Sequence, residues 1–194
     1  MKLRAATLGD SAAIAEIYAP FVTASAVSFE TEPPDEKAMR TRIEAGGGLY
    51  PWLVGEAEDG ALLGYAYAAR FRDRPAYRFA VETSVYLRSG AAGRGLGRRL
   101  YEPLLAILEG QGFTQAIAAI TVPNEASVRL HESLGFERSG TYSRVGWKLG
   151  AWHDVGLWQR PLAEPKARPD EPRRPQLSDS SRAFGSQVAR PRSG

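Results

Sequence analysis

The stretch that decides the fold is residues 85–100, VYLRSGAAGRGLGRRL. It opens with residues typical of a strand, continues as a glycine-rich loop and ends in leucines that recur every four residues, at positions 96, 100, 104 and 108. The alternating Gly93, Gly95 and Gly97 allow the backbone to approach a ligand and to turn its N–H groups to one side. Free N–H groups and the dipole at a helix start favour an anion. The segment therefore predicts a pyrophosphate site, to which Arg98 and Arg99 add positive charge.

The glycine loop has other interpretations. A strand-to-helix turn of this kind also forms without any ligand. The Walker phosphate loop requires Gly-Lys followed by Ser or Thr, which is absent here. The dinucleotide loop comes early in a β-α-β unit and has an acidic residue after the next strand, whereas residues 121–124, TVPN, lack that acid. Neither of these two phosphate loops fits, and on the loop alone a turn without a ligand stays open.

The composition is that of a single soluble globular domain, with 194 residues, 43% hydrophobic and 24% charged. The absence of cysteine excludes a disulfide framework, a thiolate metal site and a cysteine nucleophile. The two histidines lie far apart, so no metal site is expected. No run of 18 apolar residues and no secretory signal in residues 1–10 are present, so we expect a cytoplasmic protein with no membrane partner.

A change in composition divides the chain near residue 164. Residues 1–163 form the predicted globular domain, and residues 164–194 are a tail rich in Pro, Arg and Ser that we expect to be disordered. The tail carries an excess of three positive charges, which equals the net charge of +3 for the whole chain. The domain itself is neutral, and the high isoelectric point comes from the tail. It is therefore no sign that the domain binds nucleic acid, and we expect no nucleic-acid partner.

Hydrophobic periodicity predicts an α/β (α+β) fold, a mixed twisted sheet of about seven strands flanked by about four helices. The order is β-α-α-β-β-β-α-β-α-β-β. Expected strands cover residues 2–6, 50–56, 62–70, 77–88, 114–121, 136–142 and 152–160. Expected helices cover residues 11–22, 36–45, 96 to about 110, and 125–134. The interleaved hairpins and crossovers indicate helices on both faces of the sheet.

Three motifs in this order resemble the GNAT acetyltransferase superfamily: VETSVYL at 81–87, RGLG at 94–97 and NEASVRLHESLGF at 124–136. Within it, the chain is similar to the phosphinothricin acetyltransferase family through TEP at 31–33, GYAYA at 64–68 and WHDVGLWQ at 152–159. The resemblance covers about residues 3–162, and the co-occurrence of the motifs is far more specific than the loop alone. It implies the GNAT fold and acetyl-CoA as co-substrate, with no metal.

The resemblance also implies how acetyl-CoA lies. Backbone groups of residues 85–87 pair with its pantetheine arm like an added strand, residues 93–98 hold the pyrophosphate, and residues 124 and 127 contact its far side. The implied cofactor-binding residues are Val85, Tyr86, Leu87, Gly93, Arg94, Gly95, Leu96, Gly97, Arg98, Asn124 and Ser127. Asn124 has a second interpretation as the N-cap of its helix.

Two ionisable residues are candidate catalysts. Glu82 lies in an apolar strand, either on a solvated face or in a cleft. His131 shares a helix side with Ser127 and reads by itself as a partly buried histidine. The resemblance implies that Glu82 is the general base for the amine, with its pKa raised by partial burial, and that His131 protonates the leaving thiolate. Direct attack in a ternary complex needs no covalent intermediate.

The acceptor is expected to be a small-molecule amine, the α-amino group of an amino acid or analogue such as phosphinothricin, methionine sulfoximine or methionine sulfone. Candidate substrate-binding residues are Phe29, Arg72, Arg74 and Tyr77, since arginines suit a carboxylate or phosphinate. A solvated basic loop is the alternative for the arginines. The family also implies a homodimer. Other functions compatible with the fold are acetylation of a protein N-terminus or polyamine, and a non-enzymatic CoA-binding or interaction protein.

Two positions depart from the family pattern. Glu30 stands where the family commonly has an arginine, which would weaken or redirect binding of an anionic substrate group. Ala92 stands where the superfamily has Gln or Arg three residues before Gly95. Backbone N–H groups still bind a pyrophosphate without that side chain, so we expect binding to persist with one fewer polar support.

Overall fold

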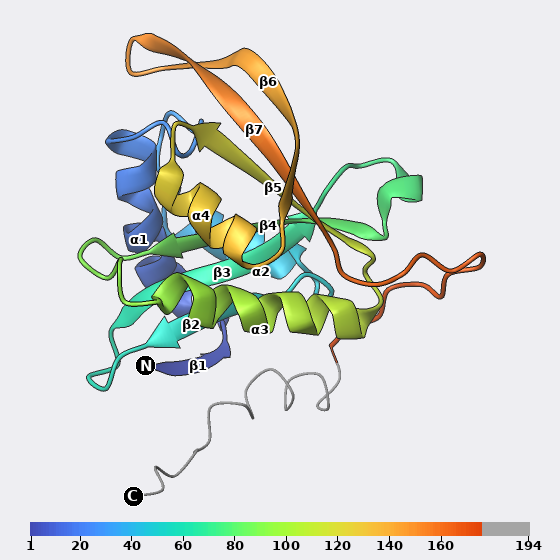
Figure 1. The fold of residues 1–194 in the computed structure, drawn as a ribbon. Coiled ribbons are helices and arrows are strands. Elements are labelled where there is room, and N and C mark those ends of the chain that lie inside the picture. Colours follow the sequence, from blue (N-terminus) through green and yellow to red (C-terminus); the bar gives the residue numbers. More distant parts are fainter. Residues whose placement is uncertain (176–194) are drawn as a thin grey trace, which may run out of the picture.

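The computed structural model describes residues 1–175, which form one seven-stranded sheet with four α-helices (Figure 1). In spatial order, the strands are β1 (Lys2–Ala5), β2 (Trp52–Glu56), β3 (Leu62–Arg70), β4 (Ala80–Leu87), β5 (Gln115–Val122), β7 (Ala151–Pro161) and β6 (Glu137–Lys148). The helices are α1 (Ser11–Thr23), α2 (Glu36–Ala45), α3 (Leu96–Gln111) and α4 (Glu125–Ser133), with short 3-10 turns η1 (Leu8–Asp10) and η2 (Pro75–Tyr77). The predicted fold class is confirmed.

The sheet is antiparallel except between β4 and β5, which are parallel and pair over only three positions. These pairs run from Ala80 with Gln115 to Glu82 with Ile117. Beyond Glu82, β4 continues to pair with β3, while β5 continues to pair with β7 as far as Val122. The two strands therefore separate, and we call this separation the β4–β5 split. It leaves backbone groups on one edge of each strand without a partner strand.

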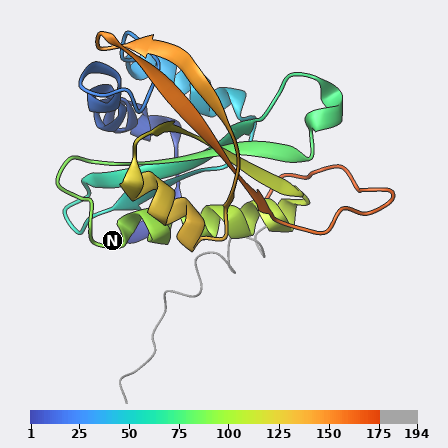
Figure 2. The same cartoon turned by 45° about the horizontal axis from the view of Figure 1, so that its top comes forward.

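Helices cover both faces of the sheet, α1 and α2 on one side and α3 and α4 on the other (Figure 2). The leucine repeat explains α3: Leu100, Leu104 and Leu108 are all fully buried in the core on their side of the sheet. A second core joins α1 and α2 to side chains of β2 and β3, including Trp52 and Tyr65. The alternation along each strand thus supplies two separate cores.

Some expected boundaries are wrong for identifiable reasons. Residues 77–79 were expected in a strand, but Pro75 begins the turn η2, because its ring fixes φ at a value that suits the first residue of a turn. The strand expected over 136–142 extends to Lys148, because β6 resumes pairing with β7 at Gly146 after a bulge. That extension makes a long hairpin that projects beyond the helices (Figure 1).

The start of the predicted tail contacts the domain. Residues 164–175 form no helix or strand, but the backbone N–H of Arg173 donates to the Gln111 carbonyl over 2.9 Å, and Glu171 pairs with Arg78 over 2.7 Å. The predicted boundary at residue 164 stays a prediction, and residues 176–194 of the expected disordered tail lie outside the described residues. None of the helices among residues 1–175 has the length and hydrophobicity needed to cross a bilayer.

Candidate active site

Glu82 lies at the apex of the β4–β5 split, in the last residue pair that joins the two strands. Its side chain is partly buried on the face of the sheet covered by α1 and α2, the same face as Tyr67 of β3. Burial raises the pKa of the Glu82 carboxyl, and the positive charge of Arg72 opposes that rise. A carboxylate whose pKa is raised accepts a proton from an ammonium more readily than an ordinary glutamate does.

A cavity of about 450 Å³ lies next to β3, one strand away from Glu82, which is not one of its lining residues. The cavity reaches Ala69, the residue directly opposite Glu82 on β3. Five aromatic residues border it, and two of them, Trp52 and Tyr67, stack there with ring centroids 4.2 Å apart. The charged residues that border it are Arg42, Arg70 and Asp73. The cavity is large enough for an amino-acid side chain.

On the opposite face of the sheet, a buried chain of hydrogen bonds runs from β4 to α4. The Tyr101 hydroxyl lies 2.6 Å from Thr83 Oγ1 and 3.1 Å from His131 Nε2. His131 Nδ1 lies 2.7 Å from the Ser127 carbonyl, so Nδ1 carries a proton and Nε2 accepts from Tyr101. Burial lowers the pKa of His131, which is only 3% exposed. The resting imidazole is therefore neutral, with its free lone pair turned to Tyr101.

Replacing Tyr101 by Phe tests this chain. The change removes the shared partner of Thr83 Oγ1 and His131 Nε2 inside the core, so we expect unfolding to become easier by about 1–3 kcal/mol. Urea unfolding measures the loss. The matched control is Tyr65→Phe, since Tyr65 is equally buried but borders the cavity on the other face. An equal loss in both variants would contradict a specific role for the Tyr101 hydroxyl.

The glycine loop adopts the conformation that its glycines predict. Gly93 and Gly95 have φ of 81° and 70°, in the left-handed region that favours glycine, and Gly95 is the N-cap of α3. The first helical hydrogen bond is donated by Arg99 to the Gly95 carbonyl, so the N–H groups of residues 96–98 have no acceptor within the helix. These three donors at the positive end of α3 can hold a phosphate group.

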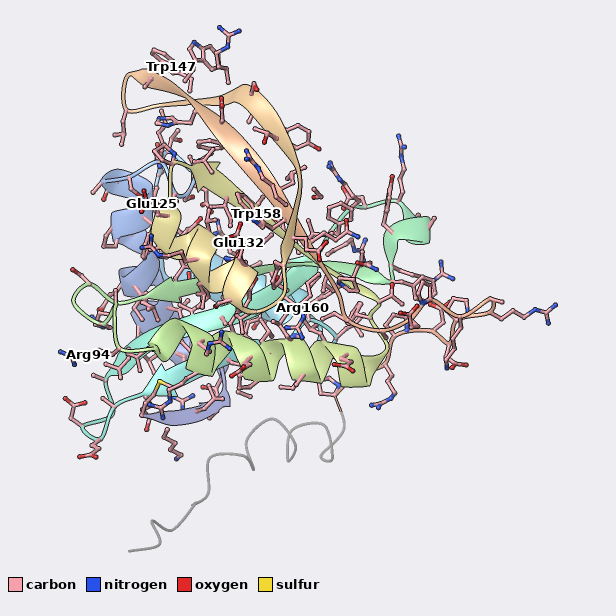
Figure 3. All side chains as sticks on the ribbon, viewed as in Figure 1. Arg94, Glu125, Glu132, Trp147, Trp158 and Arg160 are labelled. Carbon is pink, nitrogen blue, oxygen red and sulfur yellow. The ribbon has the colours of Figure 1, made fainter. Side chains whose placement is uncertain are left out.

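The side chains of Arg98 and Arg99 make contacts within the protein. Arg98 donates to Glu102 Oε1 over 2.9 Å and to the Ser133 carbonyl over 2.7 Å, and Arg99 donates to the Met1 carbonyl over 3.3 Å. Arg94 projects outward from the edge of the molecule (Figure 3). At residue 98, then, the backbone N–H rather than the side chain is available to an anion.

Asn124 caps α4, as one of its two interpretations predicted, because its Oδ1 accepts from the Ser127 backbone N–H over 3.1 Å. Ser127 Oγ lies 3.3 Å from His131 Nδ1. The cap fixes the start of the helix that carries His131. Contact of Asn124 and Ser127 with a cofactor stays a prediction.

The four predicted substrate-binding residues lie on two loops that approach the long hairpin. Phe29 packs on Gly146 of β6, where a Cβ atom would overlap the Phe29 ring. Arg72 Nη2 lies 3.4 Å from the Tyr142 hydroxyl, also on β6. Tyr77 packs edge to face on Phe71, and Arg74 is exposed. The hairpin thus brings Phe29 and Arg72 to one strand, although they are far apart in the sequence.

Replacing Arg72 by Gln should move the pH profile. The Arg72 charge lowers the pKa of Glu82, so its loss lets that pKa rise, and the acidic limb of kcat/KM shifts to higher pH. The matched control is Arg74→Gln, which removes the same charge from the same exposed loop. The pH dependence of kcat/KM for both variants measures the shift, and an equal shift in both would contradict a specific effect of Arg72.

Glu30 does not present a free carboxylate. Its two oxygens accept from the Arg42 guanidinium over 2.8 and 2.7 Å, and the Tyr18 hydroxyl donates to Glu30 Oε1 over 2.8 Å. Burial raises the pKa of Tyr18 to about 12, so its hydroxyl keeps the proton that it donates.

Sequence reasoning missed Arg42, Tyr18 and Tyr101 as site residues, because neither an ion pair nor a buried chain of hydroxyl groups leaves a periodic signal in the sequence.

No group of three or more His, Asp or Glu side chains in the described part of the chain could hold a metal ion. What the described residues do assemble is a split sheet, a helix start with three free N–H groups, and a partly buried carboxylate one strand away from a cavity. These features are those of an acetyltransferase that takes its acetyl group from a CoA thioester. The chain belongs to the GNAT acetyltransferase family, since a sequence profile for the acetyltransferase (GNAT) domain matches residues 3–157.

Relatives of known activity agree with this assignment. A phosphinothricin N-acetyltransferase of Streptomyces viridochromogenes is 42% identical over 175 residues, which span 90% of this chain and 94% of the relative. An L-methionine sulfoximine/L-methionine sulfone acetyltransferase of Salmonella typhimurium is 38% identical, over 88% of this chain and 99% of its own length. The crystal structure of a phosphinothricin acetyltransferase from Sinorhizobium meliloti in complex with acetyl-CoA superposes with a TM-score of 0.83 at 40% identity, covering 92% of this chain and 96% of that one.

Proposed function

We propose that this enzyme transfers the acetyl group of acetyl-CoA to the α-amino group of a small amino acid or amino-acid analogue. The observation that carries the proposal is the position of Glu82 at the apex of the β4–β5 split, directly across from Ala69, which borders the cavity. A base there lies between a groove for the thioester and a space for the acceptor. The relatives named for phosphinothricin and for methionine sulfoximine and sulfone indicate the class of acceptor.

For acetyl-CoA, we propose that the pantetheine arm pairs with the free edge of β4 at residues 85–87, inside the β4–β5 split. Its amides would complete the hydrogen bonds that β5 does not make there. The pyrophosphate would lie at the start of α3, against Gly93, Arg94, Gly95 and the backbone N–H groups of Leu96, Gly97 and Arg98. Ala92 offers no polar side chain, so these backbone donors supply most of the grip.

In the proposed reaction, Glu82 accepts a proton from the acceptor ammonium, directly or through one water. The neutral amine attacks the thioester carbonyl, the C–S bond breaks, and CoA leaves as a thiolate. As the amide forms, its nitrogen gives up a second proton. We propose that neutral His131, whose Nε2 is hydrogen-bonded to Tyr101, takes this proton and returns it to the thiolate, while Glu82 releases its own proton to solvent. Thiols have a pKa of about 8.5, so the thiolate needs only modest help near neutral pH.

A thiol-release assay over a panel of amines tests the proposal. The panel holds methionine sulfone, methionine sulfoximine, phosphinothricin, common amino acids, a polyamine and short peptides with free N-termini. We expect CoA release with free amino acids and no release when their α-amine is blocked. Release with peptides or polyamines alone would overturn the proposed acceptor class, and release with no amine would overturn the proposed function.

We also propose a homodimer that works in the cytoplasm, where acetyl-CoA is available. The hairpin of β6 and β7 supports a partner surface, since Val145, Trp147, Leu149 and Trp152 are between 54% and 62% exposed. Figure 3 shows Trp147 at the outer end of this hairpin. Contiguous exposed apolar side chains of this kind often mark protein interfaces. Light scattering of the purified chain measures the mass in solution, and a monomeric mass would reject the dimer.

A further inference from the structure

One cation at the cavity near Glu82, the guanidinium of Arg42, is paired with a carboxylate of the protein itself. Arg42 of α2 borders the cavity, and its guanidinium makes a two-point contact with the Glu30 carboxylate, over 2.8 and 2.7 Å. Tyr18 adds a third hydrogen bond to the same carboxylate, and the Lys148 ammonium, which donates to the Ser28 carbonyl over 2.6 Å, also lowers the pKa of Glu30. Glu30 is therefore held as an anion against Arg42.

The guanidinium gives both of its Nη groups to this carboxylate, and the negative charge of Glu30 compensates the positive charge of Arg42. The remaining charged residues at the cavity, Arg70 and Asp73, are of opposite sign. The other residues that border the cavity are aromatic or apolar, among them Trp52 and Met39. The cavity is therefore close to electrically neutral and favours an uncharged occupant over an anion.

The acceptor can reach this cavity while its amine faces Glu82. Ala69, which borders the cavity, is the cross-strand neighbour of Glu82, and directly opposed side chains lie about 5 Å apart. Tyr67 also borders the cavity, and because it pairs with Ser84, two residues beyond Glu82, its side chain is a diagonal neighbour of Glu82 on the same face. An α-amino acid with its nitrogen at Glu82 can thus extend its side chain over Tyr67 into the cavity.

We propose that this cavity holds the side chain of the acceptor, and that Glu30, by masking Arg42, makes the enzyme select uncharged side chains over anionic ones. The inference rests on the proposed amino-acid acceptor and narrows it. The substrate class is α-amino acids with an apolar or neutral polar side chain, of the size of methionine sulfone or an aromatic residue. Phosphinothricin, whose phosphinate adds a negative charge, is a poorer ligand.

The test is Glu30→Gln, which keeps the shape of the side chain and removes its charge. Binding of methionine sulfone and of phosphinothricin is measured by calorimetry, in the presence of CoA, beside turnover with acetyl-CoA. The wild-type protein should bind methionine sulfone more tightly. In Glu30→Gln the charge of Arg42 is no longer compensated, so phosphinothricin binding should improve relative to methionine sulfone binding. The expected improvement is about tenfold, the factor for one new charge-assisted hydrogen bond.

Two further variants make the test specific. Glu36→Gln removes the same charge from the exposed pair of Glu36 with Arg40 on α2 and should leave the ratio unchanged. The double variant Glu30→Gln/Arg42→Gln should return the ratio to that of the wild type, because the cation is gone. The proposal is overturned if the wild type prefers phosphinothricin, if Glu30→Gln does not change the ratio, or if the double variant keeps the change. Binding without turnover would count against the proposed function and leave this inference standing.

Discussion

Replacing Glu82 by Gln is expected to lower kcat/KM for the acceptor by a factor of about 10²–10⁴, the usual contribution of a positioned general base. The amide keeps the size of the side chain but cannot accept the ammonium proton, so attack depends on the small fraction of amine that is already neutral. Raising the pH should restore part of the rate in Glu82→Gln, because bulk solvent then supplies the neutral amine. Steady-state kinetics between pH 6 and about 9.5 measure both effects, spanning values on either side of neutrality.

The same variant should not be destabilised at neutral pH. Burial raises the pKa of Glu82 in the folded protein above its usual value. At a pH above the usual pKa of a glutamate, keeping this carboxyl charged therefore lowers the free energy of unfolding. Gln removes that cost, and thermal unfolding of Glu82→Gln should occur at an equal or higher temperature than in the wild type. The difference should shrink as the pH falls below that range, where the carboxyl is neutral in both states.

The control for Glu82→Gln is Glu137→Gln, at an exposed glutamate of strand β6. It should leave kcat/KM and the unfolding temperature unchanged. Full turnover of Glu82→Gln at neutral pH would remove Glu82 from the reaction. A lower unfolding temperature together with lost activity would instead show that the variant is misfolded, and circular dichroism separates that case.

The second large effect is expected in the glycine loop. At Gly93 and Gly95, φ is positive and no heavy atom lies within 4 Å of an added Cβ, so Ala at either position meets backbone strain rather than a clash. An exposed loop can relax into another conformation when no ligand is bound. CoA binding must then force the loop back into the strained conformation, at about 1–2 kcal/mol per residue. The double variant Gly93→Ala/Gly95→Ala should therefore bind CoA about 30-fold more weakly, or worse.

Calorimetric titration with CoA measures this change. The affinity of the acceptor for the CoA-bound protein is measured beside it and should not change, because the loop does not contact the acceptor. The control is Gly60→Ala, which has φ of 86° and an equally open Cβ position in the turn between β2 and β3, far along the chain from the loop. It should not change CoA binding. Unchanged CoA binding in the double variant would mean that the loop does not hold the pyrophosphate.

Much of the fold follows from local sequence patterns. The leucines of α3 recur every four residues, and the structure buries them together. The hairpin of β2 and β3 and the glycine loop before α3 are likewise local, because the residues that define each one are neighbours in the chain. The end of β6 was missed because its second half follows a bulge, where Arg144 adopts a φ of 49° that interrupts the alternation of faces.

The candidate site could be predicted only in part. The motifs place Glu82 and His131 by resemblance, but nothing in the sequence shows that Tyr101 joins Thr83 to His131 inside the core. Glu30 was expected to weaken or redirect binding of an anionic group, and that stays a prediction. Its ion pair with Arg42 is visible only in the structure. Such contacts depend on where separate elements pack, which no local pattern encodes.

The amino-acid sequence by itself determined the order of the elements, the glycine turn at the start of α3 and the family, since all of these depend on neighbouring residues and their spacing. Only the tertiary structure decided that β4 and β5 separate beyond Glu82, that this carboxylate is partly buried one strand away from a cavity and that Arg42 is masked there. The physical reason is that burial and charge compensation are properties of packed surroundings. A side chain's pKa and its free partners exist only once distant segments have come together.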